Sequence, residues 1–212
     1  MSVFSGSDIL VVGSLAYDSI STPAGKTDRT LGGSANYFSI AASLFAKVKV
    51  VGVVGEDYQA SDLALLTSRN VDVTGLQKKP GKTFHWAGAY DGAMNEAKTL
   101  ATDLNVFGDF NPELPESYKN SEYVFLANID PVLQLRVLEQ VKSPKFVGAD
   151  TMNFWISSKK DTLLQVLKKI DALLINEGEA KMLTGKPNAI AASDDLIKMG
   201  PKAVVVKRGE YG

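Results

Sequence analysis

Short apolar strands alternate with helices along the second half of the chain, and this alternation restricts the possible folds more than any other feature of the sequence. The predicted strands lie at 123–127, 145–149, 172–175 and 203–206, and the predicted helices at 131–141, 159–169, 177–183 and 189–199. Each strand is apolar on successive residues rather than on alternate ones, which indicates that both of its faces are buried. The pattern predicts an α/β fold, with an open, mostly parallel sheet covered by helices on both faces.

The first half of the chain begins with the same pattern and then departs from it. Its predicted elements are a strand at 9–12, a helix at 35–45, a strand at 48–54, a helix at 62–68 and a strand at 71–76. Segments 82–90 and 97–102 mix polar and apolar residues around a turn-like stretch at 91–95, which predicts an antiparallel pair that projects from the main sheet. No repeat or linker divides the chain, so we expect a single domain over 1–212, with a small β lid from about 14–31 and 82–102.

Three aromatic residues of the predicted lid, Phe84, Trp86 and Tyr90, are spaced by even numbers and so lie on one face of a strand. This face can pack on the domain, cover a ligand, or contact a second copy of the chain in a homodimer, and the sequence does not decide between these roles. His85 falls on the opposite face and is interpreted as a bystander.

Charge and composition exclude several classes of function. Lys and Arg total 23 against 24 for Asp and Glu, so the net charge of -1 provides no basic surface for nucleic acid or for an acidic membrane. The chain has no cysteine and one histidine, which excludes thiolate sites, histidine metal clusters and a cysteine nucleophile. No basic leader precedes the first strand and no stretch approaches the roughly 18 apolar residues of a membrane span, so we expect a cytoplasmic protein.

Candidate binding groups in the first half follow the first strand. Asp18 lies just beyond its carboxyl end, where ligands bind in open α/β sheets, although a solvated loop carboxylate or a cap is an equal alternative. Gly32 and Gly33 precede the first amphipathic helix and carry no Cβ, so a small ligand can approach the backbone there. The alternative interpretation of the glycine pair is a tight turn before a packed helix.

Polar groups also follow three strands of the second half. They are Asp150 with Asn153, Asn176 with Glu179, and Lys207 with Gly209. Because the carboxyl ends of parallel strands converge on one edge of a sheet, we expect these groups to line one crevice with Asp18 and Gly32. Taken singly, Asn176 is better explained as a helix N-cap and Glu179 as an ordinary first-turn carboxylate, but their coincidence at successive strand ends favours a site.

The chain resembles the ribokinase-like sugar and nucleoside kinases, the phosphofructokinase B family, over nearly its whole length. It carries, in the family's order, the motifs GSLAYD, GGSANYF, VVGVVGED, DTMNFW, NEGEAKMLTG and VVVKRGEYG. The resemblance implies a ribokinase-like fold with a β lid, ATP as phosphoryl donor together with Mg²⁺, and a hydroxyl-bearing sugar or nucleoside as acceptor. In such a transfer the protein mainly positions the reacting groups and neutralises their charge.

The same resemblance assigns roles to individual residues. The acceptor-binding positions are Asp18, Gly32, Gly33 and Asn36. The nucleotide-binding positions are Asn153, Asn176, Glu179, Lys207 and Gly209. Within the family's N-x-x-E pattern, Glu179 is expected to hold Mg²⁺ through water, and one such carboxylate suffices because Mg²⁺ keeps most of its waters.

Two departures from the family pattern affect these expectations. The family's asparagine usually stands five residues after the first glycine of the pair, where this chain has Tyr37, and Asn36 comes one position earlier. One residue on a helix is a rotation of roughly 100°, which argues against a plain ribose-like or fructose-like acceptor and leaves a nucleoside or another polyol open. The family's catalytic base and glycine-rich turn lie beyond Gly212, so we expect a C-terminally incomplete chain that is inactive alone. The alternative is a catalytically silent relative that binds a sugar or nucleoside.

Overall fold

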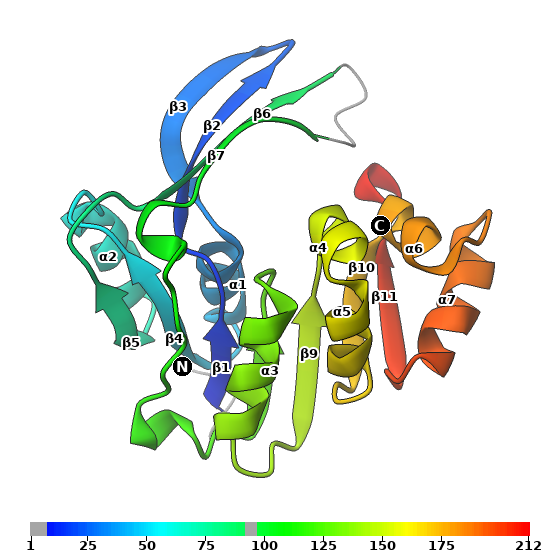
Figure 1. Cartoon of the computed structure of the whole chain (residues 1–212). Helices are drawn as coiled ribbons and strands as arrows, with labels where there is room; N and C mark the ends of the chain where they lie inside the picture. The colour runs from blue at the N-terminus through cyan, green and yellow to red at the C-terminus, as the bar shows by residue number, and fades with distance from the viewer. Residues whose placement is uncertain (1–7, 92–96) are drawn as a thin grey trace. The chain divides into compact units, whose positions relative to one another are not determined.

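The computed structural model describes residues 8–91 and 97–212, and the chain divides into two compact units, Met1–Pro115 and Glu116–Gly212 (Figure 1). Apart from Asp91, the turn predicted at 91–95 lies outside the described residues. The expectation of a single domain over the whole chain stays a prediction. Within the two described ranges, no helix has both the length and the apolar character that crossing a membrane requires.

The described part of the first unit includes three parallel strands and two α-helices. In chain order these are β1 (Asp8–Val12), α1 (Ser34–Ala42), β4 (Lys47–Val54), α2 (Ala60–Thr67) and β5 (Val71–Lys78). β4 pairs in parallel with β1 on one side and with β5 on the other. Successive apolar residues, including Val11, Val50 and Val53, are fully buried, so these strands have the two covered faces that the sequence predicted.

A second, four-stranded sheet belongs to the same unit. Its strands are β2 (Ala16–Thr22), β3 (Gly25–Gly32), β6 (Phe84–Tyr90) and β7 (Ala97–Asp103), in the order β3-β2-β6-β7. β6 and β7 form the predicted antiparallel pair, and the antiparallel hairpin of β2 and β3 joins it by parallel pairing of β2 with β6. Figure 1 shows these strands as a curved layer separate from β1, β4 and β5. The predicted small β sheet is therefore present.

The second unit continues the alternation of strands and helices. In chain order these are β8 (Tyr123–Leu126), α3 (Pro131–Gln140), β9 (Phe146–Asp150), α4 (Asn153–Ser158), α5 (Lys160–Leu167), β10 (Ala172–Asn176), α6 (Glu177–Thr184), α7 (Ala189–Lys198) and β11 (Ala203–Lys207). Its strands are parallel and lie in the order β11-β10-β9-β8. All the predicted elements of this half are present, α4 is additional, and the predicted α/β class is confirmed.

Local sequence signals fix the ends of the helices in the second unit. Asp130 caps α3 by accepting a hydrogen bond from the Val132 N–H, and Pro131 stands in the first turn, where no backbone donor is needed. α6 ends at Gly185, whose φ of 72° lies in the left-handed region that glycine tolerates. Because α4 begins three residues after the end of β9 and α6 begins directly after β10, the polar residues that follow these strands lie at helix starts.

Candidate active site

The residues predicted for the site fall into two groups, one in each unit. The first unit holds Asp18, Gly32, Gly33 and Asn36. The second unit holds Asn153, Asn176, Glu179, Lys207 and Gly209.

Asp18 lies on β2, with its carboxylate directly against Gly32 of the neighbouring strand β3. A Cβ atom at Gly32 would overlap the carboxyl group of Asp18, so the glycine leaves the space that this side chain occupies. Burial raises the pKa of Asp18 to about 6, and the nearby His85 opposes the rise. Among the described residues its carboxylate has no hydrogen-bond or ion-pair partner. Asp18 is therefore a half-buried acceptor group that hydroxyl donors of a ligand could satisfy.

Gly33 is the N-cap residue of α1 and has a φ of 90°. A Cβ atom there would lie 2.5 Å from the carbonyl oxygen of Ser14, so only glycine lets these two stretches of backbone approach. Ser14 also accepts hydrogen bonds from the first turn of α1, its hydroxyl from the Ser34 N–H at 3.1 Å and its carbonyl from the Ala35 N–H at 2.9 Å. The glycine pair thus makes room for the protein's own groups, and contact with a ligand stays a prediction.

Asn36 and Tyr37 have different surroundings at the start of α1. The buried Asn36 amide donates to the Gly32 carbonyl at 2.5 Å and accepts from the Tyr58 hydroxyl at 3.2 Å, so both of its ends are used within the first unit. Tyr37 is 60% exposed. Its hydroxyl donates a hydrogen bond of 3.3 Å to the Leu31 carbonyl, and partial burial, Asp18 and Tyr90 all raise the pKa of this hydroxyl. Sequence reasoning noted Tyr37 only as a departure from the family pattern.

The aromatic residues of β6 do not share one role. Phe84 stacks on Phe107, with ring centroids 5.3 Å apart, and is part of the packing of the first unit. Trp86 pairs in register with Asp18, and its indole ring lies over Gly88 of the same strand. Among the three aromatic residues of β6, only Phe84 stacks on another ring in the described part of the chain. Only Phe84 therefore fits the interpretation that this face packs on the domain.

His85 projects to the other face of the small sheet, as its odd position predicted. Its Nε2 lies 2.8 Å from the Ser19 hydroxyl oxygen, and its Nδ1 lies 3.2 Å from an Asp103 carboxylate oxygen. His85 thus links β2 to β7, a contact that its interpretation as a bystander missed.

In the second unit, Asn176 and Glu179 form a capping box at the start of α6. The Glu179 N–H donates to the Asn176 side-chain oxygen at 2.8 Å, and the Asn176 N–H donates to the Glu179 carboxylate at 2.9 Å. The backbone N–H of Asn153 also donates to the Glu179 carboxylate. The interpretations as N-cap and first-turn carboxylate are therefore correct, and they hold a largely buried carboxylate in a fixed position.

Asp150, at the end of β9, lies close to this carboxylate. Burial raises the pKa of Glu179; Lys207 acts to lower it and Asp150 to raise it further. Lys207, at the end of β11, forms a salt bridge with Asp150 at 3.1 Å, which limits the rise that burial causes in the pKa of Asp150. One lysine therefore faces two acidic side chains from different strand ends, and the predicted convergence of these ends is observed within the second unit.

Gly209 and Asn153 each follow a strand end by two or three residues, Gly209 after β11 and Asn153 after β9. Gly209 begins a short 3-10 turn, Gly209–Tyr211, with a φ of 61°, just after Arg208, whose Nε donates to Glu177 at 2.9 Å. The side chain of Asn153 is exposed at the start of α4. Both residues thus present accessible groups next to the strand ends.

The donor chemistry of the strand-end group fits a hard cation. Its ligands would be carboxylate oxygens, which Mg²⁺ prefers, and a cation would reduce the repulsion between Asp150 and Glu179. Among residues 8–91 and 97–212, no three His, Asp or Glu side chains are grouped to hold a metal ion by themselves. A magnesium ion at this place would therefore need water and a further ligand, such as a phosphate.

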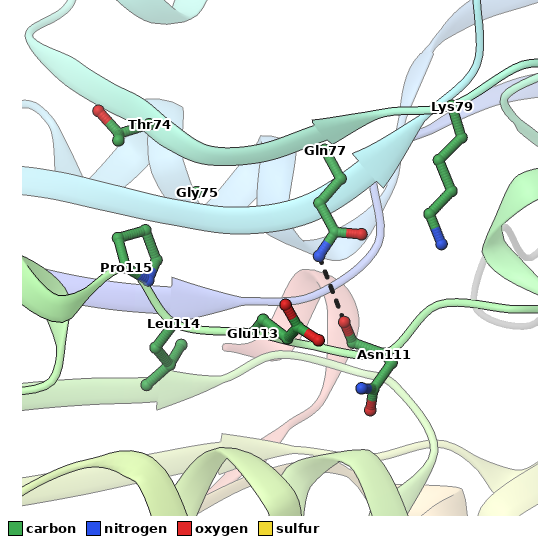
Figure 2. A pocket seen from close by; sticks show the side chains of 8 residues that line it. All are labelled: Thr74, Gly75, Gln77, Lys79, Asn111, Glu113, Leu114 and Pro115. Atoms are coloured by element: carbon green, nitrogen blue, oxygen red, sulfur yellow. Dashed lines mark hydrogen bonds between the residues drawn. The ribbon is translucent and has the colours of Figure 1, made fainter.

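The first unit also has a cavity of about 530 Å³ that none of the predicted site residues lines. It is lined by Thr74, Gly75, Gln77, Lys79, Asn111, Glu113, Leu114 and Pro115. Figure 2 shows the Gln77 side chain crossing it toward the carbonyl oxygen of Asn111, to which it donates a hydrogen bond of 3.3 Å. This cavity therefore does not mark the candidate site of the first unit.

Comparison with known proteins adds an independent observation. A model of the family described as "pfkB family carbohydrate kinase" matches residues 7–212 of the chain. A cytidine kinase from Thermococcus kodakarensis is 30% identical over 211 residues, which are 97% of this chain and 74% of that protein.

Solved structures resemble the chain at lower sequence identity. A candidate ribokinase II from E. coli, in complex with ATP and Mg²⁺, has a TM-score of 0.76 and 17% identity, with 98% of this chain and 74% of that chain covered. The nucleoside kinase of Methanocaldococcus jannaschii has a TM-score of 0.71 and 19% identity, with 98% and 72% covered. These two structures support the fold that the motifs predicted.

Proposed function

Because the chain belongs to the pfkB family of carbohydrate kinases, as its ordered motifs predicted, we propose that it transfers the terminal phosphoryl group of ATP to a hydroxyl group of a nucleoside. The acceptor oxygen forms a bond to the γ-phosphorus, the bond from that phosphorus to ADP breaks, and the hydroxyl proton is released. The observation that carries the proposal is the half-buried carboxylate of Asp18, which has no partner among the described residues.

Asp18 is the group that would hold the acceptor. A carboxylate has two oxygens and can accept hydrogen bonds from two adjacent hydroxyl groups, such as those of a ribose ring. Such donors would stabilise the ionised form, which burial now disfavours, and binding would lower the pKa of Asp18 toward its usual range. Gly32 contributes by leaving space for the carboxylate, and Asn36 by holding the backbone at Gly32 in place.

A nucleoside is preferred to a free sugar as acceptor on two grounds. The relative with 30% identity is named as a cytidine kinase, and one similar structure is named as a nucleoside kinase. In addition, the exposed side chain near Asp18 is the phenol of Tyr37, whereas the amide of Asn36 is buried and occupied. A free sugar is the second candidate, supported by the ribokinase among the similar structures.

The strand-end group of the second unit would bind ATP and Mg²⁺. We assign nucleotide binding to Asn153, Asn176, Glu179, Lys207 and Gly209, with Glu179 toward hydrated Mg²⁺. Lys207, which pairs with Asp150, would neutralise phosphate charge, and the capping box fixes the orientation of the Glu179 carboxylate. When bound, Mg²⁺ would neutralise charge on the phosphate oxygens. We assign no catalytic base among residues 1–212.

A ligand panel tests the function. Thermal unfolding of the chain is followed with cytidine, inosine, ribose and fructose, each with and without MgATP, and ATP consumption is measured in parallel. The nucleosides should raise the melting temperature more than the sugars do. Because no catalytic base is assigned among residues 1–212, stabilisation without turnover is expected of this chain and tests binding alone. Turnover would exclude the catalytically silent relative, and a response to the sugars alone would refute the nucleoside assignment.

The role of Asp18 has its own test. Asp18→Asn should weaken nucleoside binding about tenfold or more in isothermal titration, since a hydrogen bond to a charged group is worth roughly 1.5 to 3 kcal/mol. ATP binding should stay unchanged. The matched control is Asp72→Asn, an exposed carboxylate of β5 in the same unit. Equal nucleoside affinity in the wild type and Asp18→Asn would remove Asp18 from the site.

We also propose that two copies pair through β7 and that the protein works in the cytoplasm, where ATP is supplied. β7 is the outer strand of the small sheet, every one of its residues is exposed, and Leu100 is 60% exposed. An open strand edge of this kind pairs readily with a second strand. Leu100→Lys should then lower the molar mass measured by light scattering, and a wild type of monomer mass would refute the pairing.

A further inference from the structure

One aromatic side chain lies next to Asp18 in the small sheet, a second lies further along the same strand face, and a third comes from α1. Trp86 is its partner in register on the neighbouring strand β6, so the two side chains share one face of the small sheet. Tyr90 lies four residues further along β6 on that same face. The hydroxyl of Tyr37, on α1, donates a hydrogen bond of 3.3 Å to the carbonyl of Leu31, the residue before Gly32, against which the Asp18 carboxylate lies. Partial burial raises the pKa of this hydroxyl, and Asp18 and Tyr90 raise it further. We call Tyr37, Trp86 and Tyr90 the aromatic cluster.

Gly88 explains how Trp86 is oriented. The indole ring of Trp86 lies so close over Gly88 that a Cβ atom there would overlap its six-membered ring. The ring edge is fixed by a hydrogen bond of 3.3 Å from Nε1 to the Thr99 hydroxyl on β7. Trp86 is nevertheless only partly buried, so part of its side chain stays accessible.

The aromatic cluster differs from the packed rings of the same unit. Phe84 stacks on Phe107 and Phe107 stacks on Phe110, with centroids 5.3 and 5.6 Å apart. In the described part of the chain no aromatic ring stacks on Trp86. Tyr37 is 60% exposed, which is unusual for a tyrosine that only fills a core.

Resting on the proposed function, we propose that Trp86 and Tyr37 bind the base of the nucleoside whose ribose hydroxyls bind Asp18. The aromatic cluster then determines specificity: it selects an acceptor with a planar, unsaturated ring next to its hydroxyl groups and disfavours a sugar without a base. Indole and phenol rings stack on planar bases whatever the base's hydrogen-bonding pattern, so these contacts select for a base without naming which one.

The test compares cytidine with methyl β-D-ribofuranoside, which has the ribose ring and no base. Isothermal titration of the full chain gives the affinity for each. Trp86→Leu and Tyr37→Leu should each weaken cytidine binding about tenfold to a hundredfold and leave the riboside affinity unchanged. Trp86→Phe, which keeps a stacking ring, should restore most of the affinity for cytidine. Tyr37→Asn, which places an amide where the family usually has one, should narrow the preference for cytidine over the riboside.

Phe45→Leu is the matched control. Phe45 is 63% exposed just after α1 in the same unit, and its replacement should change neither affinity. Equal loss of cytidine and riboside affinity in the Trp86 and Tyr37 variants, or no loss in either, would overturn the base site. A lower molar mass of Trp86→Leu at unchanged affinities would also overturn it, in favour of a subunit interface. If the wild type binds the riboside as tightly as cytidine while the variants are normal, the nucleoside assignment itself fails.

Discussion

Replacing Asp18 with asparagine should make the ligand-free protein more stable at neutral pH. Burial raises the pKa of this carboxyl group from 3.8 to about 6, although His85 opposes the rise. Between these two pH values the folded state binds more protons than the unfolded state, so the free energy of unfolding falls as the pH rises. Above about pH 6 the folded protein carries the full cost of an ionised, half-buried side chain that has no partner in the described part of the chain.

The structure sets the size of the effect. At about 1.4 kcal/mol for each pKa unit, the difference between 3.8 and about 6 corresponds to at most about 3 kcal/mol, because solvent screens a carboxylate that is only half-buried. Asparagine has nearly the same shape without the charge, but its amide N–H groups also need partners, which reduces the gain. We therefore expect the free energy of unfolding of Asp18→Asn to rise by about 1 to 3 kcal/mol at pH 8 and to change little at pH 4.

Urea unfolding at pH 4, 6 and 8, followed by circular dichroism, measures this difference. Asp57→Asn is the control in the same unit and should have the opposite sign. Burial acts to raise the pKa of Asp57, but hydrogen bonds from Thr83 and Arg29 outweigh it and the pKa is lowered, so its ionised form stabilises the fold. An Asp18→Asn protein that is no more stable than the wild type at pH 8, or that gains equally at pH 4, would refute the reasoning.

Three further predictions concern the second unit. Glu179→Gln should keep the cap on α6, because an amide oxygen still accepts from the Asn176 N–H. The same change should weaken the magnesium dependence of ATP binding, and an unchanged magnesium titration would leave Glu179 with a capping role alone. Lys207→Met should lower the free energy of unfolding by about 1 to 3 kcal/mol at pH 8 and by less at pH 4, because it removes the cation that pairs with the buried Asp150 carboxylate. Equal losses at both pH values would contradict this prediction. Gly185→Ala should cost about 1 kcal/mol in urea unfolding, because its φ is 72°, and no loss would refute the strain.

The parallel strands and long helices could be predicted from the sequence because their signals are local. Successive apolar residues in β1, β4 and β10 and the helical spacing in α3 identify these elements without knowledge of their neighbours. α4 escaped prediction for a physical reason. It has only six residues, too few for a periodic pattern, and it ends at Lys159, whose φ of -138° breaks the helix before α5 begins.

The hairpin of β2 and β3 was also hard to predict in detail. β3 is exposed over its first five residues, so no alternation of apolar and polar side chains marks it. A bulge between Asp18 and Ile20 shifts the register with β3, where Arg29 has a φ of 50°. Beyond this bulge, the odd or even position of a hairpin residue therefore does not predict the face of the sheet on which its side chain lies.

Some features of the candidate site follow from residues that are close in sequence, whereas others depend on residues from separate strands. A spacing of three residues at a helix start predicts a cap at Asn176 and Glu179, and the cap exists. The contacts that would make Glu179 functional come from Lys207 and Asp150, which belong to other strands and are not adjacent in sequence. The cap does not compete with the proposed role, because two backbone N–H groups fix the carboxylate while its pKa is still raised by burial. A cation stabilises the ionised form of a carboxylate most when that carboxylate is rigidly held and only partly neutralised by other groups. The capping role of Glu179 therefore prepares its carboxylate for the proposed role in magnesium binding.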